Sequence, residues 1–573
     1  MTDPLSAWGA IPTDAGTRFR LWAPGVASLT LCLPGRDHDM APEGDGWFGL
    51  TTDAPEGTEY AFRLPDGMRV PDPAARRQAG DVHGPSVVAA TSHDWTHPRP
   101  DTPWHEAVIY ECHIGTFTPE GTFAAAREKL PHLADLGITV LEILPVAQFG
   151  GDRGWGYDGV LPYAPHPAYG SPEDLRELID AAHGHGIMAL LDVVYNHFGP
   201  DGNYLHLYAS DFFDPDRETP WGAGIDYRAA PVRRFFIENA LYWVRDFNLD
   251  GLRLDAIDHI RDPSEPELLV ELAREVRALG RPVHLTTEDN RNVTHLHERD
   301  GDAVPLMTAE WNDDWHNAAH VVLTGETEGY YDAYADDPVG LLVRAMADGF
   351  STGGAGGRGT PSGHLPPDAF IDFLQNHDQI GNRAMGERLT VLADPARLRA
   401  LQAVLLLSPH VPMIFMGDEW DEVAPFLFFA DFAGDLGQAV TQGRRREFEG
   451  FARFSAEDVP DPIARATFER SRIDWSHPET EPGRATLDRH RDLLALRRNR
   501  IAPLIPGTGP DCGRVLPAPE GCLAVDWRLG GGTLSVRANL GDAPVEMAAP
   551  EGEMIHLTGA DVGAPASAAV WAP

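Results

Sequence analysis

From Val108 onward, short apolar segments alternate with amphipathic helical segments, and this alternation limits the possible folds more than any other feature of the chain. Strands that alternate with helices form parallel sheets, and eight of them close into a barrel. The sequence therefore predicts an α/β protein built on a (β/α)8 TIM barrel. The eight predicted strands are 108–115, 138–146, 187–197, 251–259, 283–289, 305–311, 370–378 and 411–420.

The predicted helices follow the 3.6-residue period and lie at 123–137, 171–186, 231–247, 264–280, 395–408 and 486–500. Two of them open with capping signals, Ser171 followed by Asp174 and Ser264 followed by Glu267. The Gly-rich stretch Gly353 to Pro367 is too polar for a core and is predicted to be a loop.

Short alternating strands separated by turn residues flank this region on both sides, for example in TRFRLWAP and CLAVDWRL. We therefore expect three parts: an N-terminal immunoglobulin-like β-sandwich at 1–90, a catalytic barrel with a linker and loop insertions at 91–500, and a C-terminal β-sandwich at 501–573.

The charge balance excludes several classes of partner. The chain has 46 Lys and Arg against 87 Asp and Glu, a formal net charge of -41, which repels nucleic acid and anionic lipid surfaces. No signal peptide and no apolar run long enough for a membrane span is seen. The four cysteines lack metal-type spacing, so we expect a cytoplasmic protein, in which only Cys512 and Cys522 are close enough in sequence to meet.

Five of the predicted strands become polar at the same end. The carboxyl ends of barrel strands share one rim, so polar residues there converge, although each of them alone is more often a loop acid or a helix cap. Their joint position predicts a pocket with several carboxylates. These residues are Asp192, Asn196 and His197; Arg253 and Asp255; Glu288 and Asp289; His377 and Asp378; and Asp418 and Glu419.

Such a pocket could bind a metal or perform acid/base chemistry. No HExxH-type ligand spacing occurs, which makes the metal the weaker alternative. Aromatic residues near the acids could stack on sugar faces, which favours carbohydrate chemistry. They are Trp155, Tyr157, Trp311, Trp315, Tyr330 and Tyr331.

Four ordered motifs, DVVYNH, GLRLDAID, TTEDN and QNHDQ, resemble the signatures of the α-amylase superfamily. The resemblance implies a retaining glycosidase in which Asp255 is the nucleophile, Glu288 is the general acid/base and Asp378 is a third carboxylate that stabilises the transition state. The calcium-binding insertion that is usual after strand three in this superfamily is absent or short, so we expect no metal and no cofactor.

The same resemblance assigns substrate contacts around the three acids. Arg253 lies on the same strand face as Asp255 and is expected to favour its charged form, while Leu252 and Leu254 face the helices. Glu288 has no cation in its own segment and is expected to stay protonated. The other substrate contacts that the resemblance assigns are His197, His377, Tyr157, Trp155 and Gln379.

Longer motifs, including RGWGYDG, NDDWHNAAH and QNHDQIGNRAMGERL, are similar to the branch of the superfamily that cuts the α-1,4 bond next to the terminal trehalose of malto-oligosyltrehalose. This branch implies malto-oligosyltrehalose as substrate and functional pairing with a malto-oligosyltrehalose synthase. Asp258 and His259 stand where α-amylases often have Lys-His. Further candidates for gripping trehalose are Asp313, Asp314, Trp315, His316 and Glu419.

Two alternatives stay open. A glycogen branching or debranching enzyme shares the barrel, the acids and an N-terminal β-sandwich, but a branching enzyme passes the glycosyl group to a sugar and not to water. A catalytically dead carbohydrate-binding protein is the non-enzymatic alternative, and the presence of all three acids, Asp255, Glu288 and Asp378, counts against it.

Overall fold

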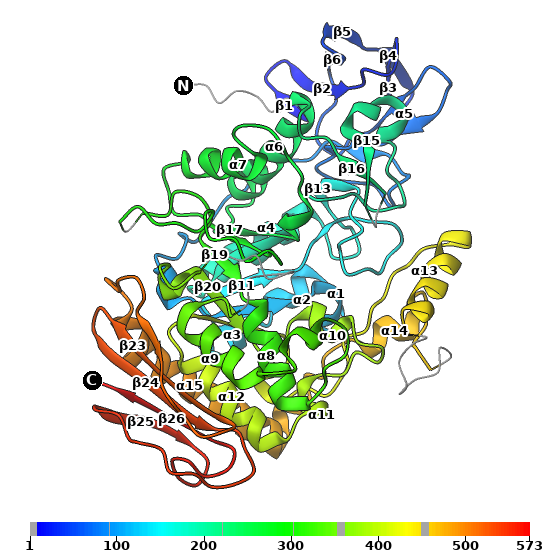
Figure 1. Cartoon of the computed structure of the whole chain (residues 1–573). Helices are drawn as coiled ribbons and strands as arrows, with labels where there is room; N and C mark the ends of the chain where they lie inside the picture. Colours follow the sequence, from blue (N-terminus) through cyan, green and yellow to red (C-terminus); the bar gives the residue numbers. More distant parts are fainter. Residues whose placement is uncertain (1–7, 91, 220–221, 302, 352–360, 449–457) are drawn as a thin grey trace.

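The eight predicted strands close into a parallel barrel in the computed structural model (Figure 1). The structure describes residues 8–573 except 91, 220–221, 302, 352–360 and 449–457. The predicted (β/α)8 barrel is therefore confirmed. Its strands are β10 (Ile109–Cys112), β11 (Val140–Ile143), β14 (Met188–Val193), β17 (Gly251–Leu254), β18 (His284–Thr287), β19 (Ala309–Trp311), β20 (Phe370–Phe373) and β21 (Val411–Phe415).

Alternate side chains of these strands face the barrel interior and the surrounding helices. Ile109, Leu190 and Met413 belong to one buried apolar cluster that fills the interior. Leu252 and Leu254 belong to a different apolar cluster, which also contains side chains of the surrounding helices. They therefore face the helices, as the alternation along this strand predicted. Arg253, between them, faces inward.

Most predicted helices are present with nearly the expected bounds. The capping box at Ser171 is confirmed, because its hydroxyl accepts from Asp174 N and the Asp174 carboxylate accepts from Ser171 N. The helices that correspond to predicted ones are α4 (Pro172–Gly184), α6 (Ala230–Asp246), α7 (Leu268–Arg277), α12 (Pro395–Leu407) and α15 (Glu481–Leu496), although α7 begins later and α15 earlier than predicted.

Two predicted helix details are wrong. The helix predicted from Ser264 begins at Leu268, because the Asp262 carboxylate, and not Ser264, accepts the N–H of Leu268 at 2.6 Å. The segment 123–137 forms two helices, α2 (Phe123–Arg127) and α3 (Leu130–Leu136). Pro131 explains the break, since proline fits the first turn of a helix but not its interior.

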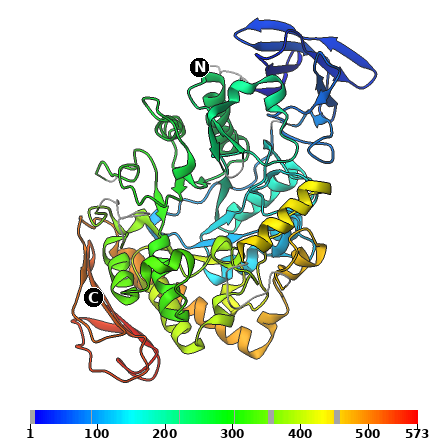
Figure 2. The same cartoon turned by 45° about the vertical axis from the view of Figure 1, so that its right-hand side comes forward.

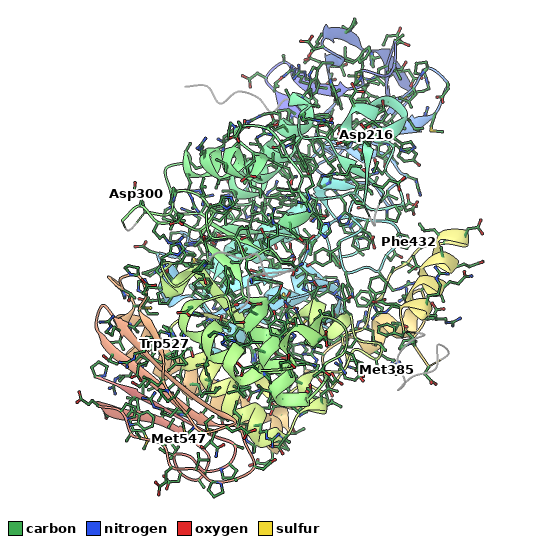
Figure 3. All side chains as sticks on the ribbon, viewed as in Figure 1. Asp216, Asp300, Met385, Phe432, Trp527 and Met547 are labelled. Atoms are coloured by element: carbon green, nitrogen blue, oxygen red, sulfur yellow. The ribbon has the colours of Figure 1, made fainter. Side chains whose placement is uncertain are left out.

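Further helices follow strands six to eight. Part of the predicted Gly353 to Pro367 loop lies outside the described residues. Phe432, labelled in Figure 3, lies just before α13, which projects from the side of the barrel in Figure 1. These helices are α8 (Asp313–Thr324), α9 (Pro338–Asp348), α10 (His377–Gly381), α11 (Leu389–Leu392), α13 (Gly434–Glu447) and α14 (Arg465–Arg470).

The N-terminal region forms two antiparallel sheets that face each other across a core, as in a β-sandwich. The ring of Phe19 on one sheet packs edge-on against Tyr60 on the other, with centroids 4.9 Å apart. One sheet contains β1 (Gly9–Thr13), β2 (Gly16–Trp22), β6 (Trp47–Thr52) and β5 (Ala41–Gly44). The other contains β4 (Arg36–Asp39), β3 (Thr30–Leu33), β7 (Glu59–Arg63) and β8 (Arg69–Val70), with β9 (Ser86–Val87) paired to β7.

The C-terminal region is rich in strands, as predicted, but its named strands form one antiparallel sheet and not two. Helices of the barrel, and not a second sheet, pack against this sheet. For example, Trp527 on β23 donates its indole N–H to the carbonyl of Met346 in α9 at 3.0 Å. Cys512 and Cys522 are both free and buried. The strands, in sheet order, are β22 (Gly513–Val515), β23 (Cys522–Leu529), β24 (Gly532–Asn539), β26 (Ser567–Ala572) and β25 (Glu553–Thr558).

The two flanking β-regions lie at opposite ends of the molecule with the barrel between them, in both views (Figures 1 and 2). None of the helices that the structure describes combines the length and apolar character of a membrane span.

Candidate active site

Arg253 is the hub of the polar cluster at the barrel rim. It is fully buried, and its guanidinium lies 2.7 Å from Asp192 Oδ2, 2.9 Å from Asp255 Oδ1 and 2.5 Å from Glu288 Oε2. The guanidinium also lies over the ring of Trp311, 4.0 Å from its centroid. A fork of several donors is what lets one arginine hold three acids together. The predicted convergence of strands three, four and five is thus present.

Asp255 directly follows β17 and keeps both carboxylate oxygens in hydrogen bonds. Arg253 donates to Oδ1 at 2.9 Å, and the side-chain amide of Asn196 donates to Oδ2 at 2.8 Å. The same amide donates to the backbone carbonyl of Asp255 at 2.9 Å. These hydrogen bonds fix the orientation of the Asp255 carboxylate at the strand end.

Ala256, the next residue, adopts a left-handed conformation with φ 41°. Its N–H donates to Glu288 Oε2 at 3.1 Å. This uncommon conformation for alanine turns the chain sharply at the strand end, and the 3-10 turn η3 (Ile257–His259), which carries Asp258, begins there.

Glu288 follows β18 beside Asp255. Burial raises the pKa of Glu288 well above its ordinary value, the charges of Asp255 and Asp378 raise it further, and Arg253 opposes them. Although its own segment carries no cation, Arg253 reaches Glu288 from the neighbouring strand. The raised pKa nevertheless favours the protonated carboxyl, the form that a general acid requires.

Asp378 and His377 open the short helix α10, whose N-cap Asn376 accepts from the N–H of Asp378 at 3.0 Å. The Asp378 side chain is 35% exposed, while His377 is buried. His377 Nε2 lies 3.6 Å from Asp378 Oδ1. Asp378 is thus the most accessible of the three predicted catalytic acids, against 12% for Asp255 and 13% for Glu288.

The loop at 149–160 contributes two aromatic side chains, Tyr157 and Trp155, that pack against His377. The ring of Tyr157 stacks on His377 with centroids 5.0 Å apart, and its hydroxyl donates to Asp192 Oδ2 at 2.5 Å. His197 Nε2 bonds to the Tyr157 carbonyl at 2.9 Å. Trp155 is buried and stacks on Phe426, so it packs behind His377 and presents no open face for a sugar.

Three of the predicted substrate contacts, Gln379, Asp313 and Asp258, lie beside this cluster. Gln379 donates from Nε2 to Asp313 Oδ1 at 3.3 Å. Burial and the charge of Asp378 raise the pKa of Asp313 to about 7. Burial also raises the pKa of Asp258. Asp258 Oδ1 and Gln379 Oε1 are buried atoms without a hydrogen-bond partner among the described residues, so both can accept from a ligand.

Two other residues after strand six belong to the core and not to the site. Trp315 is fully buried in the large apolar cluster, so it offers no flat face to a sugar. His316 is also fully buried; Nδ1 bonds to the Leu374 carbonyl at 2.6 Å and Nε2 to the Tyr331 hydroxyl at 3.1 Å. Burial lowers the pKa of His316 well below its ordinary value, so the ring is neutral.

Asp314 and Glu419 also have structural partners. The Asp314 carboxylate accepts from Asn292, from the Tyr334 hydroxyl and from the N–H of Ser351. Glu419 is fully buried, and it bonds to the Tyr110 hydroxyl at 3.0 Å and His132 Nε2 at 3.1 Å. The hydrogen bonds of these two acids hold parts of the fold together, and nothing in the geometry singles them out as substrate contacts.

Asp192 and Asn196, predicted on the polar rim but given no individual role, contact Arg253 and Asp255. Trp311, at the end of the predicted strand 305–311, lies on β19 inside the barrel. One further residue of the cluster was not predicted. Glu111 on β10, an acid inside an apolar run, contacts His377 at 2.5 Å. Its inward register, two residues after Ile109, was the available signal.

The part of the chain that the structure describes contains no group of three or more His, Cys, Asp or Glu side chains arranged to hold a metal ion.

Comparison with known proteins gives a consistent assignment. The family model of the alpha-amylase catalytic domain matches residues 101–221, and a domain family of unknown function matches residues 510–571. A malto-oligosyltrehalose trehalohydrolase of Deinococcus radiodurans is 45% identical over 513 residues, 87% of this chain and 84% of that protein.

A solved structure of a provisionally named alpha amylase from Salmonella typhimurium is 50% identical to this chain, with a TM-score of 0.96 over 99% of this chain and 100% of that chain. A 1,4-alpha-glucan branching enzyme of Streptomyces coelicolor is 36% identical over 299 residues, which are 46% of this chain and 38% of that enzyme. The match to the branching enzyme thus covers less than half of either protein.

Proposed function

Because the chain belongs to the malto-oligosyltrehalose trehalohydrolases, glycosidases of the α-amylase family, we propose that it cuts malto-oligosyltrehalose with the three carboxylates at its barrel rim. The bond cut is the α-1,4 bond next to the terminal trehalose. The products are trehalose and a maltooligosaccharide. The observation that carries the residue assignment is the shared contact of Asp255 and Glu288 with one guanidinium, that of Arg253.

In the proposed first step, an Asp255 oxygen attacks the anomeric carbon while Glu288 gives its proton to the glycosidic oxygen, and trehalose leaves. Because Asp255 and Glu288 contact neighbouring nitrogens of the same guanidinium, they lie close together, as a retaining pair about 5 Å apart requires. In the second step, water gives its proton to Glu288 and attacks the anomeric carbon, which breaks the bond to Asp255.

The other residues of the cluster stabilise the transition state and orient the sugar. Asp378 presents a carboxylate toward the opening, where it can accept from sugar hydroxyls and favour an oxocarbenium-like transition state. His377 offers its Nε2–H to a hydroxyl, and Tyr157, whose carbonyl is held by His197, offers its ring beside it.

Specificity for trehalose is proposed to come from acceptors on the leaving-group side. A non-reducing disaccharide offers only hydroxyls there, so buried oxygen atoms without hydrogen-bond partners are suited to accept from it. A ligand that does not donate to these atoms binds more weakly, because a buried acceptor without a partner costs free energy. Asp258 Oδ1 and Gln379 Oε1 are such atoms, and Asp313 lies beside Gln379. Because this substrate has to be made from a maltooligosaccharide, we also propose functional pairing with a malto-oligosyltrehalose synthase.

The test is an analysis of products. Incubation with maltotriosyltrehalose is expected to release free trehalose and maltotriose, whereas maltopentaose, a control of equal length without the trehalose end, is expected to be a poor substrate. Transfer of glucosyl units to a second chain without trehalose release would support a branching enzyme instead.

The specificity proposal has its own test. Asp258→Asn keeps the side-chain volume but replaces one acceptor with a donor, so it is expected to lower kcat/KM for maltotriosyltrehalose more than for maltopentaose, by about tenfold. Equal losses for both substrates would remove Asp258 from the trehalose contacts.

A further inference from the structure

Glu111 on β10 contacts His377 with both carboxylate oxygens. Oε1 lies 2.5 Å from His377 Nδ1, and Oε2 accepts from the backbone N–H of His377 at 3.2 Å. Both side chains are only 1% exposed. Glu111 therefore fixes both the imidazole ring and the backbone of His377, the first residue of α10.

The other nitrogen of His377 lies on the side of Asp378. Nε2 is 3.6 Å from Asp378 Oδ1, and stacking on Tyr157, with an interplanar angle of 16°, fixes the plane of the ring. Trp155 meets the ring edge-on at 5.6 Å. With Nδ1 held by Glu111, the ring has one remaining nitrogen, and it faces the accessible carboxylate.

We propose that Glu111 is a positioning residue: its carboxylate keeps His377 doubly protonated, so that Nε2 always carries a hydrogen to donate beside Asp378. The proposal rests on the proposed function, in which that hydrogen goes to a sugar hydroxyl. A neutral ring has one donor and one acceptor nitrogen, whereas the charged ring has two donors. The neighbouring carboxylates thus decide whether His377 can act as donor.

The electrostatics of the surroundings agree with this geometry. Burial disfavours the charged ring, but Glu111 and then Asp378 outweigh it and raise the pKa of His377 to about 9. The ionisable groups that face His377 from the elements packed around it are Glu111 on β10, Asp378 on α10, Arg253 on β17, Glu142 on β11, Asp192 on β14, His113 after β10 and Tyr157.

The charge balance of the pair suits the proposed chemistry. A positively charged histidine by itself repels an oxocarbenium-like transition state. Glu111 supplies a compensating negative charge 2.5 Å from the ring, so His377 gains donor strength without a net positive charge beside the sugar.

Glu142 provides a natural contrast. It lies opposite Glu111 in the pairing of β10 with β11 and is equally buried. Its Oε2 has no hydrogen-bond partner among the described residues, and burial raises the pKa of Glu142 well above its ordinary value, with Glu111 adding to the effect. Burial thus favours the neutral form of Glu142, the form that replacement by Gln imitates.

The experiment measures the titration of His377 directly. In protein labelled with [13Cε1]histidine, the His377 signal, identified by its loss in His377→Asn, is expected to titrate at about 9 in the wild type. In Glu111→Gln the midpoint is expected at or below about 6.5, the ordinary value, because burial then dominates. Glu142→Gln is expected to leave the midpoint unchanged.

Kinetics supply the second readout. For Glu111→Gln, kcat/KM with maltotriosyltrehalose is expected to be close to wild type at pH 5.5 and about tenfold lower at pH 8, where His377 has lost its proton. Glu142→Gln is expected to follow the wild-type pH profile. A purely structural role for Glu111 would lower kcat/KM by the same factor at every pH.

The proposal is overturned if wild-type His377 titrates at or below 6.5, or if Glu111→Gln leaves its midpoint in place. The wild-type titration decides the question even if Glu111→Gln does not fold. A chain that releases no trehalose at any pH contradicts the proposed function, whereas the titration still tests the link between Glu111 and His377.

Discussion

The barrel strands carry buried acids on both faces, and only one face forms a candidate site. On the inner face, Asp192, Asp255 and Glu288 converge on Arg253. On the outer face, Glu310 of β19 accepts from the Thr287 hydroxyl at 2.6 Å and lies 3.2 Å from His297 Nε2. Burial of an acid on a strand is therefore not a sign of function by itself.

The two faces differ in how their acids are satisfied. Asp372 of β20, on the outer face, accepts from Asn312 at 2.8 Å and from His410 at 2.8 Å, and all three side chains are buried. The inner acids share one cation, and Asp255 and Glu288 are partly exposed. The fully buried hydrogen bonds of the outer acids hold neighbouring segments of the fold together. The inner acids share a cation and are partly exposed, so they can exchange a hydrogen-bond partner for a substrate.

The largest effect is expected for Asp255→Asn on the inner face. Loss of the nucleophile is expected to lower kcat by at least about four orders of magnitude, because no covalent intermediate can form. The side-chain volume is kept, so the circular dichroism spectrum is expected to match the wild type. Full activity in this variant would show that the inner cluster is not the catalytic centre.

Arg253→Met is expected to affect both activity and stability. It removes the one cation shared by Asp192, Asp255 and Glu288. Breaking a buried ion pair from one side costs about 3–5 kcal/mol, which urea unfolding can measure. We also expect kcat to fall by about a thousandfold, since the acids then repel one another and lose their alignment. Wild-type stability in this variant would contradict the hub role of Arg253.

Asp372→Asn tests the outer face with a matched change from acid to amide. Asn312 and His410 then lose a charged acceptor, so the free energy of unfolding is expected to fall by about 1–3 kcal/mol. The kcat of the folded protein is expected to equal that of the wild type. If kcat fell as far as in Asp255→Asn, the distinction between the two faces would fail.

Among the variants at the site, Asp313→Asn is expected to change kcat least: besides weakening the proposed trehalose contact, which affects KM, it shifts the pH profile. The negative charge of Asp313 helps to raise the pKa of Glu288, so its removal lowers that pKa. Glu288 has to be protonated to act as an acid, and kcat/KM is therefore expected to start falling at a lower pH, by roughly half a unit. Asp332→Asn, at an exposed position in η4 (Gly329–Tyr334), is the control and is expected to leave the profile unchanged.

Periodicity in the sequence was sufficient to predict the barrel, because each strand has to bury both faces and each helix one. It also predicted the convergence of Arg253, Asp255 and Glu288, since parallel strands end at one rim. It could not predict which acids on the neighbouring strands Arg253 contacts, because such contacts depend on how the strands are aligned with one another. The contact of Arg253 with Glu288 was for that reason not predicted.

The four candidate substrate contacts after strand six do not lie together, and the reason is geometric. Asp313, Asp314, Trp315 and His316 are consecutive residues at the start of α8. Consecutive helical residues are turned by about 100°, so four of them point to all sides and cannot all face one pocket. Similarly, a count of C-terminal strands does not say whether one sheet or two form, and here α9 packs on β23 through Met346 and Trp527.

The single guanidinium shared by Asp255 and Glu288 has a consequence for the order of events in the proposed cycle. When Asp255 becomes an ester, its negative charge disappears, and with it one of the charges that raise the pKa of Glu288. Arg253 stays in place and is then shared by fewer anions. The proton affinity of Glu288 falls at this stage, so the residue that acted as an acid becomes ready to act as a base without any movement of the chain.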